Sequence, residues 1–222
     1  MIARSASRCR LRKSTGVSVV MRANLMKRTL LLLAALAATA GMPNAAAATL
    51  ARATFAGGCF WCMEPPFERL AGVVSVTSGY VGGHADHPTY DDVSGGGTGH
   101  RESVEVLYDP RRVSYATLLD VFWHNVDPTD SEGQFCDRGN QYRTAVFFHD
   151  ETQHRLAEQS RLAVARRLGS IATDILPAGP FFRAEEEHQD YYRKNPWRYR
   201  LYRYNCGRDK QLKKLWGQAP AH

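Results

Sequence analysis

The segment Gly57-Gly58-Cys59-Phe60-Trp61-Cys62-Met63-Glu64 joins a predicted strand, residues 51–56, to a predicted helix that continues to about Leu70. Two consecutive glycines let the backbone turn sharply between these elements. The turn would place Cys59 at the helix N-terminus, where free backbone N–H groups and the helix dipole stabilise a thiolate and lower the pKa of the thiol. The segment therefore predicts a strand, a turn and a helix, with a reactive cysteine at the turn.

Two large aromatic rings, those of Phe60 and Trp61, directly follow Cys59. A cysteine in a tight Gly-Gly-Cys turn, taken alone, is more often a buried structural residue. Two rings at an exposed turn favour a functional interpretation, because together they can form an apolar pocket for a methyl group. Pro65 and Pro66 predict a late or distorted helix start, because proline clashes with the interior of a regular helix.

The rest of the chain alternates between strands and helices. Strands are predicted over 73–81, 103–108, 144–148 and 171–176, and helices over 151–168 and from an N-cap at Ser114 to about Asn125. A glycine-rich loop, 94–99, and a long polar loop, 127–143, are candidates for functional loops. This order predicts an α+β fold, a ferredoxin-like two-layer sandwich whose mixed sheet is covered mainly on one side, with a long irregular C-terminal tail.

The net charge of +7 lies at the N-terminus. Residues 1–48 contain eight basic and no acidic side chains, and the remainder is nearly neutral. A nearly neutral domain has no general electrostatic reason to bind phosphate backbones, since that affinity comes from clustered Lys and Arg. The composition therefore argues against a nucleic-acid-binding protein.

The first 48 residues have the order of a secretory signal peptide. Lys27 and Arg28 precede an apolar run, 30–38, and a small-residue stretch, 45–48, follows. The apolar run is too short for a stable membrane anchor, and a disordered basic leader or a retained amphipathic anchor fits the order less well. We expect cleavage near Ala48 and export, to the periplasm, of a mature catalytic domain over 49–222.

The sequence resembles a known family at this point. Gly58-Cys59-Phe60-Trp61 and Glu64 are similar to the signature of A-type peptide methionine sulfoxide reductases. The similarity continues through 79–83, 88–90, 99–102, 127–128, 137–139, 141–143 and 187–191. The resemblance implies an enzyme that reduces methionine-S-sulfoxide, free or in proteins, and so repairs oxidised proteins.

Reduction of a sulfoxide needs an acid, because attack of a thiolate on sulfur builds negative charge on the oxygen. The resemblance assigns that role to Glu102, and burial would raise its pKa and keep it protonated. It assigns Tyr90 and Tyr142 to hydrogen bonds with the sulfoxide oxygen, and Asp137 to the lining of the same site.

His188 and Tyr191 lie three residues apart in a helical-looking stretch, 184–193, so both can face one side. We predict that they contact the substrate together with Phe60 and Trp61. A lone histidine in such a stretch is more often a surface residue, so a structural role for His188 stays open.

Four cysteines remain after the leader, and in an exported protein a structural disulfide is the plain expectation. The resemblance implies a redox cycle instead, in which Cys59 becomes a sulfenic acid and a second thiol condenses with it. Cys62, in a Cys-X-X-Cys pair, and Cys206, in the tail, both fit this resolving role. Cys136 is as consistent with a spectator as with a redox role, and we do not count it as catalytic.

Electrons can arrive as thiols, so no metal, flavin or nicotinamide cofactor is expected. The partners implied by the resemblance are methionine sulfoxide in peptides and proteins, and thioredoxin or a thioredoxin-like dithiol reductant. We expect a monomer without a stable membrane anchor.

Three other interpretations remain. A thioredoxin-like disulfide oxidoreductase would use Cys59 and Cys62 but leaves Glu102 without a task. A structural zinc module would use all four cysteines, although the later two lack paired spacing. The aromatic and basic segment 191–204 would suit stacking on single-stranded nucleic acid, but basic side chains around packed aromatics are commoner.

Overall fold

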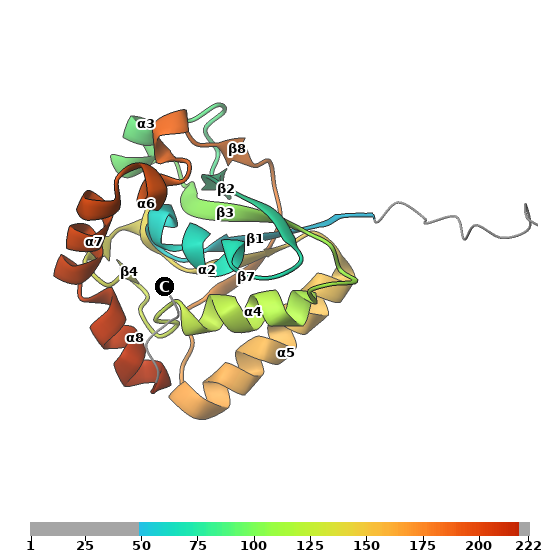
Figure 1. Ribbon diagram of the computed structural model, residues 1–222. Coiled ribbons are helices and arrows are strands. Elements are labelled where there is room, and N and C mark those ends of the chain that lie inside the picture. The colour runs from blue at the N-terminus through green and yellow to red at the C-terminus, as the bar shows by residue number, and fades with distance from the viewer. Residues whose placement is uncertain (1–48, 218–222) are drawn as a thin grey trace, which may run out of the picture. The chain divides into compact units, whose positions relative to one another are not determined.

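A six-stranded mixed sheet forms the centre of the computed structural model, which describes residues 49–217 (Figure 1). Its strand order is β7-β6-β1-β3-β2-β8. Neighbouring strands are antiparallel except for β6 and β7, which are parallel. The strands are β1 Ala51–Ala56, β2 Val73–Val81, β3 Arg101–Tyr108, β6 Ala145–Phe148, β7 Asp174–Pro177 and β8 Phe182–Arg183. The predicted signal peptide, 1–48, lies outside the described residues.

Helices of very different length connect the strands. The α-helices are α2 Glu64–Glu68, α3 Tyr90–Ser94, α4 Tyr115–His124, α5 Glu151–Leu168, α6 Tyr191–Lys194, α7 Pro196–Asn205 and α8 Arg208–Trp216. The 3-10 turns are η1 Phe60–Cys62, η2 Asn140–Tyr142 and η3 Glu186–His188, and a small hairpin pairs β4 Gly133–Gln134 with β5 Asp137–Arg138. Within residues 49–217, no helix has both the length and the apolar character needed to cross a membrane.

The larger hydrophobic core lies between the sheet and the helices α2, α4, α5 and α8. Phe55 of β1 stands at its centre, with its ring centroid 5.1 Å from that of Phe67 in α2 and 5.2 Å from that of Phe122 in α4. Figure 1 shows α4 and α5 packed side by side. A smaller cluster on the other face consists of Ala56, Val81, Ala145 and Phe147. The predicted mixed sheet is confirmed.

Alternation along β3 directs an acidic residue toward the helical layer. Val104 and Val106 belong to the larger core, and Glu102, two residues earlier, has the same orientation because strand side chains alternate with period 2. Glu102 pairs in register with Tyr80 of β2. The sheet thus presents this carboxyl group to the segment that follows β1.

The elements with clear periodicity match their predictions. β1, β2 and α5 have the predicted bounds, and Ser114 caps α4 by accepting a hydrogen bond from the Thr117 N–H. The prolines have the predicted effect: the helix after Cys59 is split into the short turn η1 and α2, and a proline stands at the start of α2, where no hydrogen bond is lost.

The prediction of an irregular C-terminal tail is wrong, because residues 191–216 form α6, α7 and α8. Pro196 begins α7, and α8 buries Leu212 and Trp216 against the core. Gly207 separates α7 from α8 with φ +65°, a conformation that glycine adopts without strain. Arginines and tyrosines occupy most positions of α7, and only Arg203 is buried. Polar contacts of Arg203 with Asp209 and of Tyr202 with Asp137, rather than an apolar stripe, hold the helix on the domain.

Candidate active site

The two glycines before Cys59 are required by close contacts. Gly58 has φ +79°, and a Cβ on it would lie 2.6 Å from the Cβ of Gln134. A Cβ on Gly57 would lie 2.5 Å from the sulfur of Met63. The chain then turns through η1, where the Cys62 N–H donates to the Cys59 carbonyl at 3.0 Å. This turn brings the two thiols into hydrogen-bond contact in the interior, where both are buried.

The negative charge of this thiol pair lies on Cys62. Burial raises the pKa of the Cys59 thiol well above its usual value, and the hydrogen bond to Cys62 and the nearby Glu102 add to the effect. The same hydrogen bond, donated by Cys59, lowers the pKa of Cys62 to about 6, and Arg208 contributes. The prediction of a lowered Cys59 pKa is therefore wrong for this state: η1 has three residues, and its dipole is outweighed by burial.

Glu102 is a buried carboxyl group beside the thiols. Its Oε2 accepts a hydrogen bond from the Phe60 N–H at 3.0 Å, and its side chain is 2% exposed. Burial raises the pKa of Glu102 to about 8, and the charge of Asp137 acts in the same direction. Glu102 therefore keeps its proton at neutral pH and can act as an acid.

Phenol groups gather around Glu102 and Cys59. Tyr90 and Tyr142 each lie within electrostatic range of Glu102, Cys59 and Asp137. Burial raises the pKa of Tyr90 to about 12 and raises that of Tyr142 further, so both phenols remain hydrogen-bond donors. Burial also raises the pKa of Asp137. The fold thus brings all five predicted catalytic residues together.

The aromatic side chains that were predicted to form a pocket pack together in a cluster around Trp61. Its ring stacks on Tyr191 with centroids 3.8 Å apart, and its Nε1–H donates to Nδ1 of His188 at 3.2 Å. His188 stacks in turn on Tyr90, with centroids 4.2 Å apart. Phe60 is fully buried behind these rings, where it contacts Tyr90 and His188. Phe60 therefore supports this aromatic cluster from the inside, with no exposed surface of its own.

The helical-looking stretch that carries His188 and Tyr191 is not one helix. Asp190, with φ 53°, separates η3 from α6. Both side chains nevertheless reach Trp61. Across this break, Tyr191 stacks on the Trp61 indole, and His188 accepts the hydrogen bond from the indole N–H.

Cys136 and Cys206 form a disulfide across 70 residues of sequence. Of the two roles left open for Cys136, the disulfide excludes that of a free spectator thiol, and Cys206 is bonded to Cys136 rather than to Cys59. The disulfide ties the end of α7 to the loop that carries Asp137. It also engages two of the four thiols that a four-cysteine zinc site would need.

Sequence reasoning missed Tyr202 and Arg208. The Tyr202 hydroxyl donates to the Asp137 carboxylate, and the spacing of Tyr199, Tyr202 and Cys206 by three and four residues could have indicated this helix face. Arg208 is 1% exposed and donates to the carbonyls of Gly57 at 3.0 Å and of Asn125 at 2.7 Å. A buried arginine directly after Cys-Gly carries no sequence signal.

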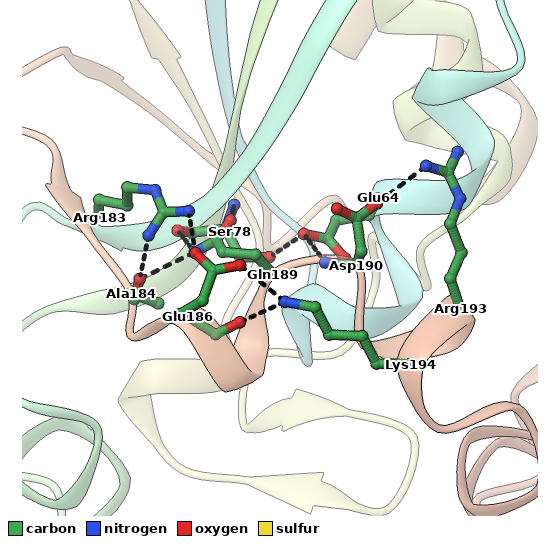
Figure 2. A network of polar contacts seen from close by, with 9 residues as sticks. All are labelled: Glu64, Ser78, Arg183, Ala184, Glu186, Gln189, Asp190, Arg193 and Lys194. Atoms are coloured by element: carbon green, nitrogen blue, oxygen red, sulfur yellow. Dashed lines mark hydrogen bonds and ion pairs between the residues drawn. The ribbon is translucent and has the colours of Figure 1, made fainter.

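A polar network joins α2 and β2 to the chain around residues 183–194, the part that contains His188 and Tyr191 (Figure 2). Glu64 of α2 accepts hydrogen bonds from the Ser78 hydroxyl at 2.9 Å and from the Asp190 N–H at 3.3 Å. The Gln189 side chain donates to the carbonyls of Ser78 and Ala184, both at 2.9 Å. The network therefore fixes the segment 184–190 on β2 and on the helix that follows Cys59.

Replacement of Glu64 by glutamine is expected to weaken the pH dependence of stability. Burial raises the pKa of Glu64 to about 7, so the folded chain binds this proton more tightly than the unfolded chain does. The contribution to the free energy of unfolding is complete below about pH 4.5 and is lost as the pH rises through about 7, by on the order of 3 kcal/mol. Glutamine removes this titration.

Urea unfolding at pH 5 and at pH 8 measures this effect in the wild type and in Glu64→Gln. Glu187→Gln, a change at an exposed glutamate, is the control. A pH dependence of the same size in wild type and Glu64→Gln would contradict the assignment.

The amino-acid sequence is similar to those of known proteins over most of its length. A family model described as peptide methionine sulfoxide reductase matches residues 51–220. Peptide methionine sulfoxide reductase MsrA from Bacillus licheniformis is 51% identical over 173 residues, which cover 75% of this chain and 93% of that protein. Peptide methionine sulfoxide reductase MsrA 2 from Caulobacter vibrioides is 50% identical over 196 residues, covering 86% of this chain and 100% of that protein.

Solved structures show the same similarity. Reduced Mxr1 from Saccharomyces cerevisiae matches with a TM-score of 0.65 and 32% identity, covering 68% of this chain and 88% of that one. Methionine sulfoxide reductase A of Corynebacterium diphtheriae matches with a TM-score of 0.64 and 35% identity, covering 70% and 77%. With a matching family model and relatives at about half identity, the chain belongs to the peptide methionine sulfoxide reductase family.

Proposed function

We propose that this protein reduces methionine-S-sulfoxide, free or in proteins, to methionine, with Cys59 as the nucleophile. The observation that carries the proposal is the buried carboxyl group of Glu102, whose pKa burial raises to about 8, beside a pair of hydrogen-bonded thiols and next to the aromatic cluster around Trp61. The substrate methyl group packs against Trp61. The sulfoxide oxygen faces Glu102, Tyr90 and Tyr142, which donate protons or hydrogen bonds to it.

In the first step the Cys59 sulfur attacks the sulfoxide sulfur while its proton passes to Cys62. Glu102 protonates the oxygen, so that no full negative charge develops on it. The oxygen is transferred from methionine to Cys59, which becomes a sulfenic acid. The methionine sulfur gains the two electrons that Cys59 loses, and methionine leaves.

In the second step Cys62 attacks the sulfenic sulfur, which releases water and forms the Cys59–Cys62 disulfide. Cys62 resolves first because it already contacts Cys59 and its lowered pKa favours the thiolate. Reduced Cys206 then exchanges with this disulfide, and Cys136 displaces the internal thiol. The Cys136–Cys206 disulfide is the end point of this sequence. A thioredoxin-like dithiol reduces it.

Turnover of the two methionine sulfoxide epimers with dithiothreitol tests the activity. We expect methionine to form from the S epimer and not from the R epimer, which is the stereochemistry of the family. The same assay separates this activity from that of a thioredoxin-like disulfide oxidoreductase, which would reduce protein disulfides without consuming sulfoxide. Absence of methionine from both epimers would contradict the proposed function.

Removal of the resolving thiol is expected to stop the cycle after its first step. The Cys62→Ser variant should release about one methionine per enzyme and then turn over far more slowly with thioredoxin than the wild type, because the Cys59 sulfenic acid persists. Rapid-quench measurement of methionine gives both quantities. Cys136→Ser, assayed with dithiothreitol beside Cys62→Ser, is the control, since it leaves Cys62 in place to resolve Cys59 and loses only the disulfide that thioredoxin reduces. Unimpaired steady-state turnover by Cys62→Ser would refute the resolving role.

We also propose the setting in which the enzyme works. Export to the periplasm and a mature domain over 49–222 are supported by the leader pattern, in which the apolar run is too short for a stable membrane anchor. A monomeric state stays a prediction. A ferredoxin-like unit is supported by the strand order β6-β1-β3-β2, with α2 between β1 and β2 and α4 between β3 and β6.

A further inference from the structure

A groove of 630 Å³ lies beside the Cys136–Cys206 disulfide. Its lining includes Cys206 itself, Phe135 and Arg138 from the loop that carries Cys136, and Lys210 and Lys214 from α8. We call it the C-terminal groove. Of the two bonded cysteines, Cys136 is exposed and Cys206 is half-buried. A disulfide at the wall of an open groove is accessible to a thiol on another protein.

The charged side chains that line the C-terminal groove have a small excess of positive charge, with Arg138, Lys210 and Lys214 against Asp127 and Asp130. Arg138 is neutralised by Asp130, at 2.7 Å, and the carboxylate of Asp127 accepts hydrogen bonds from Thr129 and from Gln211. Lys210 and Lys214 are exposed and form no ion pair within residues 49–217.

The C-terminal segment that contains these lysines, residues 191–216, is also rich in positively charged residues. Between Tyr191 and Trp216 there are nine Lys and Arg residues and one Asp, although the chain after residue 48 is nearly neutral as a whole. Arg193, Lys194 and Arg203 are paired with acidic side chains and Arg208 is buried. The basic excess near the groove therefore comes from the remaining exposed residues, Lys210 and Lys214 among them. An approaching protein with carboxylates around its dithiol would be attracted to this side of the molecule.

We propose that the C-terminal groove is the docking site for an acidic protein dithiol, which Lys210 and Lys214 orient toward the Cys136–Cys206 disulfide. The proposal rests on the proposed function, because that cycle leaves this disulfide to be reduced. Carboxylates of the partner pair with the two lysines, and its dithiol lies over the disulfide.

Cys206 lines the groove, but Cys136 is the more exposed of the two residues and is therefore the one attacked. The thiolate of the partner forms a bond with Cys136, the Cys136–Cys206 bond breaks, and Cys206 leaves as a thiolate that takes a proton from solvent. The second thiol of the partner then displaces Cys136. Two electrons pass from the dithiol, which ends as a disulfide, to the two cysteines. Cys206 is freed first, on the helix that also carries Tyr202 into the active site.

Charge reversal at the groove tests the proposal. Lys210→Glu and Lys214→Glu are compared with Lys213→Glu, a matched control that is exposed on the same helix but does not line the groove. Each enzyme is assayed with thioredoxin, regenerated by thioredoxin reductase and NADPH, and in parallel with dithiothreitol. A small dithiol needs no docking surface, so it reports on the active site alone.

We expect kcat/KM for thioredoxin to fall roughly tenfold or more in Lys210→Glu and Lys214→Glu, with a smaller difference at high salt. Rates with dithiothreitol should stay unchanged, and Lys213→Glu should behave as the wild type. Equal losses in all three variants, no loss at all, equal losses with dithiothreitol, or a wild type that thioredoxin does not reduce would each overturn the docking proposal. A wild type that is inactive with dithiothreitol would instead refute the proposed function.

A trapping experiment tests the choice of sulfur. Thioredoxin that lacks its second active-site cysteine should form a mixed disulfide with Cys136, which peptide mass spectrometry of the wild-type complex identifies. Attachment at Cys206 would overturn this part of the proposal.

Discussion

Replacement of Cys59 by serine is expected to reduce turnover of methionine sulfoxide by at least about 10⁴-fold, the scale seen when an enzyme loses its nucleophile. A hydroxyl group ionises far less readily than a thiol, and an oxygen atom cannot accept the sulfoxide oxygen to form a sulfenic acid. Serine is close in size to cysteine and fits the buried turn, so the loss should not come from misfolding. Chromatographic measurement of methionine, with dithiothreitol as reductant, gives the rate.

Cys62→Ser is the informative comparison for this loss. It makes the same chemical change three residues away, in the same buried turn. It should still release its first methionine, at a lower rate than the wild type, because serine does not take the Cys59 proton as the Cys62 thiolate does. Sustained turnover by Cys59→Ser would show that another group attacks the substrate. A circular dichroism spectrum like that of the wild type confirms that the variant is folded.

Replacement of Glu102 by glutamine is expected to lower kcat by about 10²- to 10⁴-fold, the usual contribution of a general acid. Glutamine can still accept the hydrogen bond from the Phe60 N–H, but it has no acidic proton for the sulfoxide oxygen. Glu105→Gln is the matched control, since Glu105 lies on the same strand with its side chain directed to the opposite face. A Glu102→Gln enzyme with nearly wild-type kcat would exclude the carboxyl group as the acid.

The pH profile gives a second test of Glu102. Its protonated form is the active one, and burial raises its pKa to about 8, so activity should fall as the pH rises through about 8. On the acid side, activity should rise through about 6 as Cys62 loses its proton. Glu102→Gln should lose the alkaline limb. If the activity of Glu102→Gln still fell as the pH rises through about 8, that decrease would be caused by the titration of another group.

Local patterns predicted the parts of the fold that local forces decide. The long helix α5 and the N-cap of α4 follow from periodicity and capping, and both are found where the sequence indicated. Glu102 could be assigned because its strand alternates cleanly and because the family resemblance named it. The alternation also accounts for its burial, which sets its protonation state.

The features that the sequence did not reveal depend on distant contacts. Cys136 meets Cys206 only after the long loop and the C-terminal helices fold over the site. The raised pKa of Cys59 reflects burial by residues from several elements, whereas the sequence showed only the favourable effect of a helix terminus. The helix α7 has few apolar residues of its own, and tertiary packing decides its structure.

The central claim is that Cys59 takes the oxygen atom from the substrate. The most direct measurement uses the Cys62→Ser enzyme with its Cys136–Cys206 disulfide intact, mixed with methionine-S-sulfoxide and dimedone, which traps sulfenic acids. Peptide mass spectrometry should find the dimedone adduct on Cys59, in an amount equal to the methionine released. Methionine formed without an adduct on Cys59, or with the adduct on another residue, would contradict the account.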